Sequence, residues 1–424
     1  MALSPEARHL NKEMKSGPFF NMLSKKGKAI YFPKKGFVQQ SLDAKNSRIN
    51  ATAGIANEED GGVMHLGLMG KELNIAPARA FSYSPSSGNP ELRQLWKDAI
   101  LKKSPSIRSD ISMPIVTCGI THAIFIAAYL FAEKGVDVIM PDLYWENYNL
   151  IFENGFGARL KTFPMFSGNS FNVEGLDAAI KESKRPLVLL NFPNNPTGYT
   201  PTNSEAEAIA SVIGENAKAK PFAVVCDDAY FGLVYKEGVF KESLFAKLME
   251  KENVLAVKCD GATKENYAWG FRVGFITFGA RGATKEIYSA LENKTIGAIR
   301  GSVSSAPTPS QSIILDSLKD PSLMGQKQEK LQTLKARFDE VESILKEEKY
   351  RKWFEPLPFN SGYFMCLTPK GIDAERLRKK LLVEYGVGVI AIAGKVRVAY
   401  SAIPKQRLRE LFDSMADACE KLPK

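Results

Sequence analysis

Three clusters of polar residues lie at intervals along the middle of the chain, close to the ends of short apolar runs. They are Asn-Phe-Pro-Asn-Asn-Pro-Thr-Gly at 191–198, Asp-Asp-Ala-Tyr at 227–230, and Lys264 with Arg272 eight residues later. A lysine amine can attack an aldehyde and move a proton, and a guanidinium binds anions through two parallel hydrogen bonds. Taken singly, each cluster also fits a turn, a helix cap or a solvated side chain. Their order and spacing together predict one site that combines an amine, carboxylates and an anion-binding group.

The composition excludes several classes of protein. The 424 residues are 44% hydrophobic and 25% charged, with 32 glycines and 23 prolines, which is typical of a globular chain and unlike collagen or a disordered segment. No apolar run approaches the roughly 20 residues that span a bilayer. The first residues also lack the apolar core of a signal peptide. We therefore expect a cytoplasmic protein without a membrane partner.

The charge, cysteine and histidine counts narrow the chemistry further. The 57 Lys and Arg against 47 Asp and Glu give a net charge of +10, but the basic residues are spread along the chain, so we expect no nucleic-acid partner. The five cysteines lie far apart without a Cys-x-x-Cys pair, which indicates thiols in a reducing compartment. With only three histidines, neither a metal site nor a Ser-His-Asp triad is expected.

The elements that must position the three clusters alternate between strands and helices. Short apolar runs predict buried strands over 136–140, 187–191, 222–227, 254–258 and 273–278. Helical periodicity predicts helices over 91–103 and 204–216. Such alternation favours an α/β fold with a mostly parallel sheet flanked by helices. Ligands bind beyond the carboxyl ends of the strands in such a sheet, which is where the clusters fall.

From about residue 321 the pattern changes, and a smaller α+β domain is expected. Residues 325–350 favour a long helix with one apolar face, 363–367 and 396–400 favour strands, and a final helix begins near Pro404. We therefore divide the chain into three parts. They are an N-terminal segment, 1–70, that contributes to the small domain, a large domain, 71–320, and a C-terminal small domain, 321–424.

The motifs resemble those of the class I and II aminotransferases, pyridoxal 5′-phosphate enzymes of fold type I. The motifs that carry the resemblance are Tyr-Ser-Pro-Ser-Ser-Gly at 83–88, Gly-Ile-Thr-His-Ala at 119–123, Asn-Asn-Pro-Thr-Gly at 194–198, Asp-Asp-Ala-Tyr at 227–230, Lys264 with Arg-Val-Gly at 272–274, and Arg-Val-Ala at 397–399. The segment 50–62 is most similar to the aspartate aminotransferase branch. The resemblance implies a fold type I transferase with pyridoxal 5′-phosphate as its cofactor and a large domain, 71–320, that binds it.

The resemblance also implies roles for the residues that act on the cofactor's reactive atoms. Lys264 is expected to hold the cofactor's aldehyde carbon and to move the substrate's α-proton. Asp227 is expected to face the pyridine nitrogen and keep it protonated, which makes the ring a better electron sink. Tyr230 and Asn195 resemble the pair that hydrogen-bonds the cofactor's phenolic oxygen.

Other residues match the positions that hold the cofactor's phosphate. Arg272 and the helix start at Ile120 and Thr121 offer a guanidinium, backbone N–H groups and a hydroxyl. Tyr83 resembles the tyrosine that reaches the phosphate of the partner subunit, which implies a homodimer with composite sites.

The chain departs from the family's pattern at Gly261, where a serine usually stands three residues before the lysine. One phosphate hydrogen bond is then missing or comes from Thr263. An aromatic residue of the segment 141–148 is expected to stack on the ring, and Trp145 is favoured over Tyr144 by the alignment of the residues that follow.

The same resemblance implies an amino acid and a 2-oxo acid as substrates. Arg397 matches the arginine that binds the α-carboxylate, with Asn195 and Trp145 beside the substrate. Arg300 stands where the aspartate branch keeps an arginine that binds a second carboxylate from the neighbouring subunit, so aspartate or glutamate is expected. The alternatives are an aromatic or neutral amino acid, or a β-lyase reaction on the same fold. A non-enzymatic regulator is disfavoured, because the cofactor residues are intact and no helix-turn-helix motif precedes residue 50.

Overall fold

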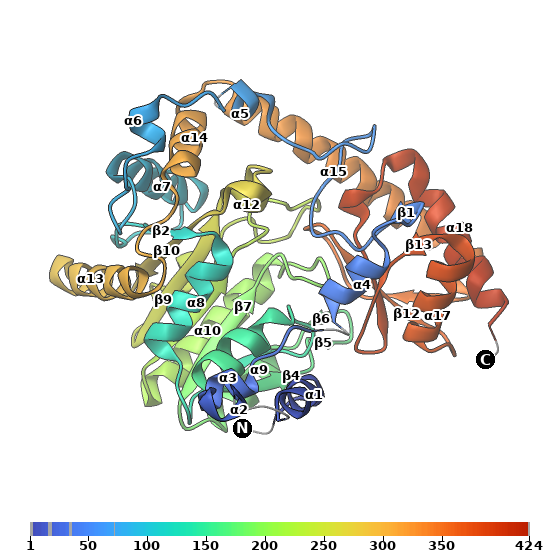
Figure 1. Cartoon of the computed structure of the whole chain (residues 1–424), viewed down its shortest axis with the longest axis horizontal. Helices are drawn as coiled ribbons and strands as arrows, with labels where there is room; N and C mark the ends of the chain where they lie inside the picture. The colour runs from blue at the N-terminus through green and yellow to red at the C-terminus, as the bar shows by residue number, and fades with distance from the viewer. Residues whose placement is uncertain (1–2, 16–18, 34–35, 72, 423–424) are drawn as a thin grey trace.

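A seven-stranded sheet occupies one side of the molecule, and a smaller four-stranded sheet occupies the other (Figure 1). The computed structural model describes residues 3–15, 19–33, 36–71 and 73–422. In spatial order the strands of the large sheet are β2 (Ile115–Cys118), β10 (Val273–Gly279), β9 (Val254–Gly261), β8 (Phe222–Asp227), β7 (Pro186–Asn191), β3 (Asp137–Pro141) and β4 (Arg159–Phe163). Strand β10 is antiparallel to both of its neighbours, and the other neighbouring strands are parallel. The predicted mostly parallel sheet is confirmed.

The central strands are buried on both faces, as their continuous apolar sequences predict. Every residue of β10 is buried, and β8 and β9 each have a single partly exposed residue. The sequence patterns missed the two edge strands, β2 and β4. Strand β2 has only four residues, and β4 carries exposed and half-exposed polar residues such as Arg159 and Lys161, so neither forms a long apolar run.

Helices cover this sheet. They are α7 (Pro90–Lys103), α8 (Ile120–Phe131), α9 (Val173–Lys181), α10 (Asn203–Ala219), α11 (Leu244–Leu248), α13 (Lys285–Ser302) and α14 (Thr308–Lys319). Helix α8 contacts β2, β8, β9 and β10, which brings its first turn to the edge where β8 and β9 end. Shorter elements in the connections are the π-helix η1 (Asn149–Gly155), the hairpin strands β5 (Phe166–Ser167) and β6 (Ser170–Phe171), α12 (Ala262–Glu265) and the 3-10 helix η2 (Trp269–Phe271).

The C-terminal part forms an antiparallel sheet with helices packed against it. Its strands, in spatial order, are β11 (Phe354–Pro356), β12 (Met365–Pro369), β15 (Lys395–Val398) and β14 (Ile390–Ile392). The helices are α15 (Leu323–Lys346), α16 (Glu348–Arg351), α17 (Ala374–Lys380), η3 (Leu381–Tyr385), η4 (Tyr400–Ala402) and α18 (Lys405–Glu420). The long helix predicted over 325–350 is divided at Glu347, whose backbone is extended. Pro404 caps α18 from outside its first turn.

The N-terminal segment divides its contacts between the two sheets. Its helices are α1 (Pro5–Met14), α2 (Phe19–Met22), α3 (Lys25–Ala29), α4 (Phe37–Asp43) and, at its end, α5 (Gly67–Lys71); α6 (Pro77–Ala80) follows the segment. Helix α1 contacts α2 and α3, α3 contacts η1, and Asn154 of η1 donates to the Ala29 carbonyl (Figure 1). Helix α4 packs near β13 (Val387–Gly388) and β14, and β1 (Ile49–Asn50) pairs with β13. The segment therefore contributes to the C-terminal part only from α4 onward.

The described residues show neither a membrane-spanning helix nor a metal cluster. None of their helices combines the length and the apolar character needed to cross a bilayer. Within the same ranges, no three histidine, cysteine, aspartate or glutamate side chains gather closely enough to hold a metal ion.

Candidate active site

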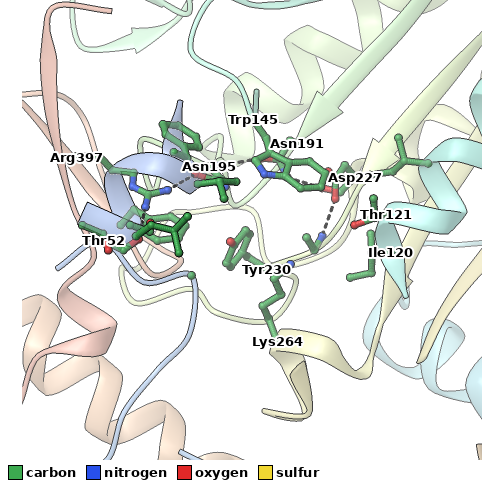
Figure 2. A pocket seen from close by; sticks show the side chains of 18 of the residues that line it. Thr52, Ile120, Thr121, Trp145, Asn191, Asn195, Asp227, Tyr230, Lys264 and Arg397 are labelled. Carbon is green, nitrogen blue, oxygen red and sulfur yellow. Dashed lines mark hydrogen bonds between the residues drawn. The ribbon is translucent and has the colours of Figure 1, made fainter. Parts of the chain in front are cut away.

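A pocket of about 440 Å³ opens at the carboxyl ends of β7, β8 and β9 (Figure 2). It joins residues from the two sheets and from α4, which are far apart in the sequence. The residues that line it are Phe37, Val38, Ser41, Leu42, Lys45, Thr52, Gly54, Ile120, Thr121, Ile124, Trp145, Asn191, Asn195, Asp227, Ala229, Tyr230, Lys264, Phe364 and Arg397. Eight residues predicted for the site are among them: Ile120, Thr121, Trp145, Asn195, Asp227, Tyr230, Lys264 and Arg397.

The amine of Lys264 enters this pocket from α12, directly after β9. Its Nζ lies 4.9 Å from the centroid of the Tyr230 ring, and Figure 2 shows the side chain rising toward Tyr230. Burial lowers the pKa of Lys264 to about 8, although the Asp227 carboxylate opposes the shift, and the Arg272 guanidinium lowers the pKa further. A large fraction of this amine is therefore neutral near pH 8, which a nucleophile or a base requires.

The carboxylate of Asp227 is held in a defined orientation at the end of β8. Its Oδ2 accepts a hydrogen bond from the hydroxyl of Tyr148 at 2.5 Å, and its Oδ1 accepts one from the backbone N–H of Ala229 at 3.1 Å. The side-chain amide of Asn191 donates to the Asp227 backbone carbonyl at 2.8 Å. Burial raises the pKa of Asp227, and the hydrogen bond from Tyr148 and the charge of Lys264 oppose that rise.

Three glycines bring β9, β10 and the start of α8 into close contact beside this pair. A Cβ at Gly274 would lie 2.5 Å from the Gly119 carbonyl carbon, and a Cβ at Gly261 would lie 2.6 Å from the Val273 oxygen. Gly119 has a φ of +80°, and a Cβ there would meet the Arg272 guanidinium at 2.5 Å. The side chain of the serine that usually stands at this position in the family would therefore clash with the backbone here.

The close approach leaves a set of anion-binding groups at the start of α8. Arg272 lies against Gly119, so its guanidinium sits beside the first turn of a 12-residue helix. Backbone N–H groups in that turn lack helical acceptors and attract negative charge. The hydroxyl of Thr263 is buried and has no hydrogen-bond partner among the described residues. Thr263 is not among the residues that line the pocket, so its replacement of the missing serine stays a prediction.

The guanidinium of Arg397 lies at the opposite end of the pocket, on β15. It is sandwiched between Phe37 and Phe364, with its central carbon 4.7 and 4.2 Å from the two ring centroids. One terminal nitrogen donates to Asn195 Oδ1 at 3.1 Å, and the other donates to the Thr52 carbonyl at 2.7 Å. The buried Nε has no partner in the described structure, so one donor of this cation is unused.

Trp145, and not Tyr144, lines the pocket. Both belong to the loop between β3 and η1, but the Tyr144 ring is directed along Tyr148, with the ring centroids 6.4 Å apart. The neighbouring Tyr148 turns inward and reaches Asp227. Of the two aromatic candidates for stacking, the geometry favours Trp145.

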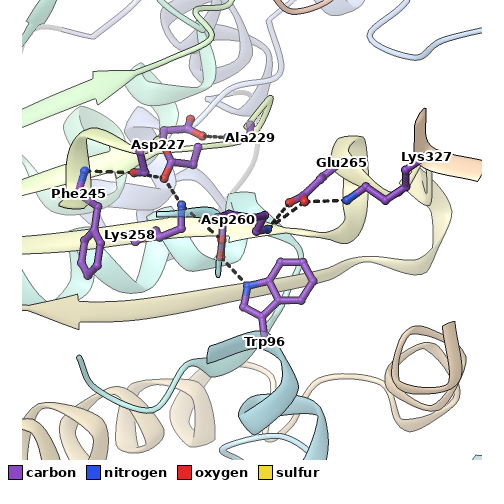
Figure 3. A network of polar contacts seen from close by, with 11 residues as sticks. Trp96, Asp227, Ala229, Phe245, Lys258, Asp260, Glu265 and Lys327 are labelled. Atoms are coloured by element: carbon purple, nitrogen blue, oxygen red, sulfur yellow. Dashed lines mark hydrogen bonds and ion pairs between the residues drawn. The ribbon is translucent and has the colours of Figure 1, made fainter. Parts of the chain in front are cut away.

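A network of buried charges fixes the strand and helix that carry these groups (Figure 3). Lys258 forms ion pairs with Asp228 and, at 3.5 Å, with Asp260. Trp96 donates to Asp260 at 3.0 Å. All four side chains are buried, so β8, β9 and α7 are joined by polar contacts behind the pocket.

A second ion cluster anchors α12 directly after Lys264. Glu265 pairs with Lys103 of α7 at 2.9 Å and with Lys327 of α15 at 2.8 Å (Figure 3). Burial alone would raise the pKa of Glu265, but the two ammonium groups lower it to about 2. The residue that follows the pocket lysine is therefore ionised at neutral pH and attached to two helices.

Four predicted residues are not among those that line the pocket: Arg272, Tyr144, Tyr83 and Arg300. Arg272 lies against Gly119, next to Ile120, and Tyr144 directly precedes Trp145, whereas the other two lie at the surface. Tyr83 is 94% exposed, and Arg300, on α13, donates to Ser304 at 2.8 Å at the surface. In Figure 1, α13 extends away from the large sheet. Neither Tyr83 nor Arg300 lines the pocket in the described structure, so the roles expected for them stay predictions.

Sequence reasoning missed several residues of the pocket and its support. Tyr148 and Asn191 belong to segments that the sequence analysis includes, but no sequence pattern indicates which of their side chains turns toward Asp227. The α4 residues, including Phe37, carry no motif at all. The helix begins after Gly36 without a side-chain cap, so no capping residue marks its start in the sequence.

The family of the chain follows from a comparison with protein-family models. Residues 69–415 match the model described as aminotransferase class I and II. The chain belongs to this family. Solved structures with the same fold include an aminotransferase from Anaerococcus prevotii, 23% identical, with a TM-score of 0.82 over 94% of this chain and 100% of that one. A kynurenine aminotransferase from Pyrococcus horikoshii is 19% identical, with a TM-score of 0.80 over 97% of this chain and 100% of that one.

Curated relatives are similar over shorter stretches. A probable aspartate/prephenate aminotransferase from Aquifex aeolicus is 26% identical over 56% of this chain and 57% of its own length. An aspartate aminotransferase from Streptomyces avermitilis is 32% identical over 46% of both chains. The chain thus spans about half the length of these curated relatives. An aspartate/prephenate aminotransferase from Thermus thermophilus is 26% identical over 79% of this chain and 82% of its own.

Membership of this family implies a cofactor. The class I and II aminotransferases depend on pyridoxal 5′-phosphate. The described residues fit that group, because a buried amine, a held carboxylate and an anion-binding corner face one pocket, and the Thr263 hydroxyl beside them lacks a partner. The predicted family and its fold type I architecture are confirmed.

Proposed function

We propose that this chain is an aminotransferase that moves an amino group from an amino acid to a 2-oxo acid. One observation carries the proposal: a single pocket contains the buried amine of Lys264, the held carboxylate of Asp227 and the guanidinium of Arg397 with an unused donor. The family match and relatives with aminotransferase activity support it.

The cofactor's position follows from the fixed charges of the pocket. Pyridoxal 5′-phosphate, when bound, supplies an aldehyde that condenses with amines and a ring that accepts electrons. Arg272, with Ile120 and Thr121 at the start of α8, would hold the phosphate. Asp227 would keep a proton on the pyridine nitrogen, and Tyr148 would keep Asp227 in place.

The remaining residues act on the substrate. Lys264 moves the α-proton, because its pKa of about 8 lets the amine both accept and return a proton near neutral pH. Trp145 would stack on the cofactor ring, and Tyr230 would donate to its phenolic oxygen. Asn195 lies between the two ends, since its side chain already accepts a hydrogen bond from Arg397. Arg397 binds the α-carboxylate through its paired nitrogens.

The active form is proposed to be a homodimer. Phe81 and Tyr83 are 87% and 94% exposed in the isolated chain, which is unusual for aromatic side chains unless another surface covers them. In a dimer, Tyr83 would reach the partner's phosphate site and Arg300 the partner's substrate. We also propose the cytoplasm as the location, because all five cysteines are unpaired thiols.

The test is a screen of amino donors against 2-oxo acids with the purified holoenzyme. The proposal expects the formation of a new amino acid in equal amount to the new 2-oxo acid. Pyruvate and ammonia without a new amino acid would instead indicate the β-lyase reaction. Comparing aspartate, glutamate, alanine and phenylalanine in wild type and Arg300→Ala then tests Arg300, whose loss should weaken only the dicarboxylic donors.

A further inference from the structure

Helix α4 and the two residues after it form one wall of the pocket. Phe37, Val38, Ser41 and Leu42 line it, followed by Lys45. The wall faces the same cavity as Lys264 and Arg397, yet no motif of the three polar clusters includes it. Its composition is distinctive, since three apolar side chains and one hydroxyl are followed by an ammonium group.

The position of this wall is fixed by hydrogen bonds at both ends. The backbone N–H of Phe37 donates to Glu146 Oε2 at 2.8 Å, directly after Trp145 in the loop that enters the pocket. Gln40 exchanges two hydrogen bonds with the backbone of Ala391 on β14, at 2.9 and 2.7 Å. The Asn50 side chain donates to the Ala44 carbonyl at 3.0 Å, next to Lys45. The backbone that carries Lys45 is therefore held against the pocket.

Lys45 is the remaining cation among the pocket-lining residues. The lining contains three cationic side chains, Lys45, Lys264 and Arg397, and one carboxylate, Asp227. Lys264 is committed to the cofactor and Arg397 to the α-carboxylate. Within the described residues, the Lys45 ammonium has no ion pair or hydrogen bond, so its charge is available to a ligand.

The apolar part of the wall is also uncovered. Val38 is 40% exposed and Leu42 is 54% exposed in the pocket mouth. An amino acid whose α-carboxylate is held by Arg397 and whose α-carbon faces Lys264 would extend its side chain along this surface. Apolar contact suits a hydrocarbon side chain, and an ammonium at the far end suits a terminal anion.

We propose that Lys45 is a specificity residue that binds the terminal acid group of a substrate whose hydrocarbon side chain lies against Val38 and Leu42. The substrate class is therefore amino acids and 2-oxo acids with a second carboxylate. The inference rests on the proposed function and deepens it. It differs from the prediction for Arg300, because Lys45 acts within its own chain.

The variant Lys45→Met tests this with little change in shape, since methionine keeps the hydrocarbon stem and removes the charge. We expect kcat/KM for glutamate to fall about tenfold, as for a lost charge-assisted hydrogen bond. The value for alanine should stay within about twofold. Lys45→Arg should retain most of the activity with glutamate. Lys346→Met, at an exposed site at the end of α15, is the matched control and should change neither value.

A binding measurement tests the role of Lys45 without relying on enzyme turnover. Succinate and butyrate differ by one carboxylate, and both can be titrated against the holoenzyme by the absorbance of its cofactor. Lys45→Met should weaken succinate about tenfold and leave butyrate unchanged.

Two results would overturn the assignment of Lys45. One is an equal loss for glutamate and alanine, which would mean that the residue only supports structure. The other is unchanged glutamate activity in Lys45→Met. In either case alanine turnover shows that the aminotransferase itself stands. A wild-type holoenzyme that transfers no amino group from any donor would instead refute the proposed function.

Discussion

Two buried lysines six residues apart, Lys258 and Lys264, have opposite surroundings. Lys258 lies within β9 and pairs with Asp228 and Asp260. Burial would lower the pKa of Lys258, but the two carboxylates raise it, so the ammonium is permanently charged. Lys264 has no ion pair in the described structure and faces the ring of Tyr230, and its burial lowers the pKa to about 8.

The difference shows that burial alone does not make a lysine reactive. A buried ammonium whose charge is balanced by carboxylates is a structural element. A buried amine without such a pair spends part of its time neutral and becomes a nucleophile. The neighbouring aspartates divide in the same way, because Asp228 is paired with Lys258 and Asp227 faces the pocket.

The largest effect is expected for the unpaired lysine. Lys264→Ala should reduce the rate of amino transfer by at least about 10⁴-fold, because the nucleophile and the proton carrier are lost together. The fold should persist, since no ion pair is broken. Single-turnover assays and thermal unfolding measure the two quantities. Transamination at a rate comparable to wild type would remove Lys264 from the mechanism, and borohydride reduction of the holoenzyme should modify this residue alone.

The unpaired aspartate should come next. Asp227→Ala should slow α-proton removal about 10²- to 10⁴-fold, because the charge that holds a proton on the pyridine nitrogen is lost. Tyr148→Phe should have a smaller effect, since it removes one hydrogen bond and leaves the carboxylate. Isotope exchange at the α-carbon measures the step directly. A wild-type rate in Asp227→Ala would show that Asp227 has no role in the reaction, so that it would not differ from Asp228 in function.

The paired lysine should affect stability instead. Lys258→Met leaves Asp228 and Asp260 buried with a cation removed, which should lower the free energy of unfolding by about 3–5 kcal/mol. The double variant Lys258→Met/Asp228→Asn should recover part of that loss, because it removes one of the uncompensated charges. Urea denaturation of the wild type, Lys258→Met and the double variant measures the free energy of unfolding of each. A loss below about 1 kcal/mol would show that the cluster is not a structural ion pair.

The fold was predictable where apolar residues follow one another without interruption. The runs at 222–227 and 254–258 fall within β8 and β9, because strands buried on both faces tolerate few polar side chains. The edge strand β4 was missed, since Arg159 and Lys161 face solvent there. The domain boundaries at 70 and 321 stay a prediction, although the contacts of the N-terminal segment change at α4.

The site was predictable in its motifs and unpredictable in its contacts. Lys264 and Asp227 lie where strand ends converge, and the pocket contains both, as their spacing indicated. The partners that tune them come from elsewhere in the chain. Tyr148 meets Asp227 from 79 positions away, and Phe37 reaches Arg397 from the N-terminal segment. Only folding brings such pairs together, and a single sequence carries no record of them.

The smallest effect concerns pH and sharpens the contrast between the two lysines. Attachment of pyridoxal 5′-phosphate to cofactor-free protein requires the neutral amine of Lys264. Since its pKa is about 8, the attachment rate should rise with pH around a midpoint near 8 and level off above it. An exposed lysine would give a midpoint near 10.4.

Replacing one neighbour should move that midpoint in a known direction. The Asp227 carboxylate raises the pKa of Lys264, so Asp227→Asn should shift the midpoint to lower pH. Lys258→Met should leave it nearly unchanged, because the charge of Lys258 is balanced by its own carboxylates. Stopped-flow absorbance records the curve from about 2 pH units below the midpoint to about 3 units above it. A midpoint that stays fixed in Asp227→Asn would mean that this carboxylate does not change the pKa of Lys264. The explanation of the two lysines by their neighbouring carboxylates would then be wrong.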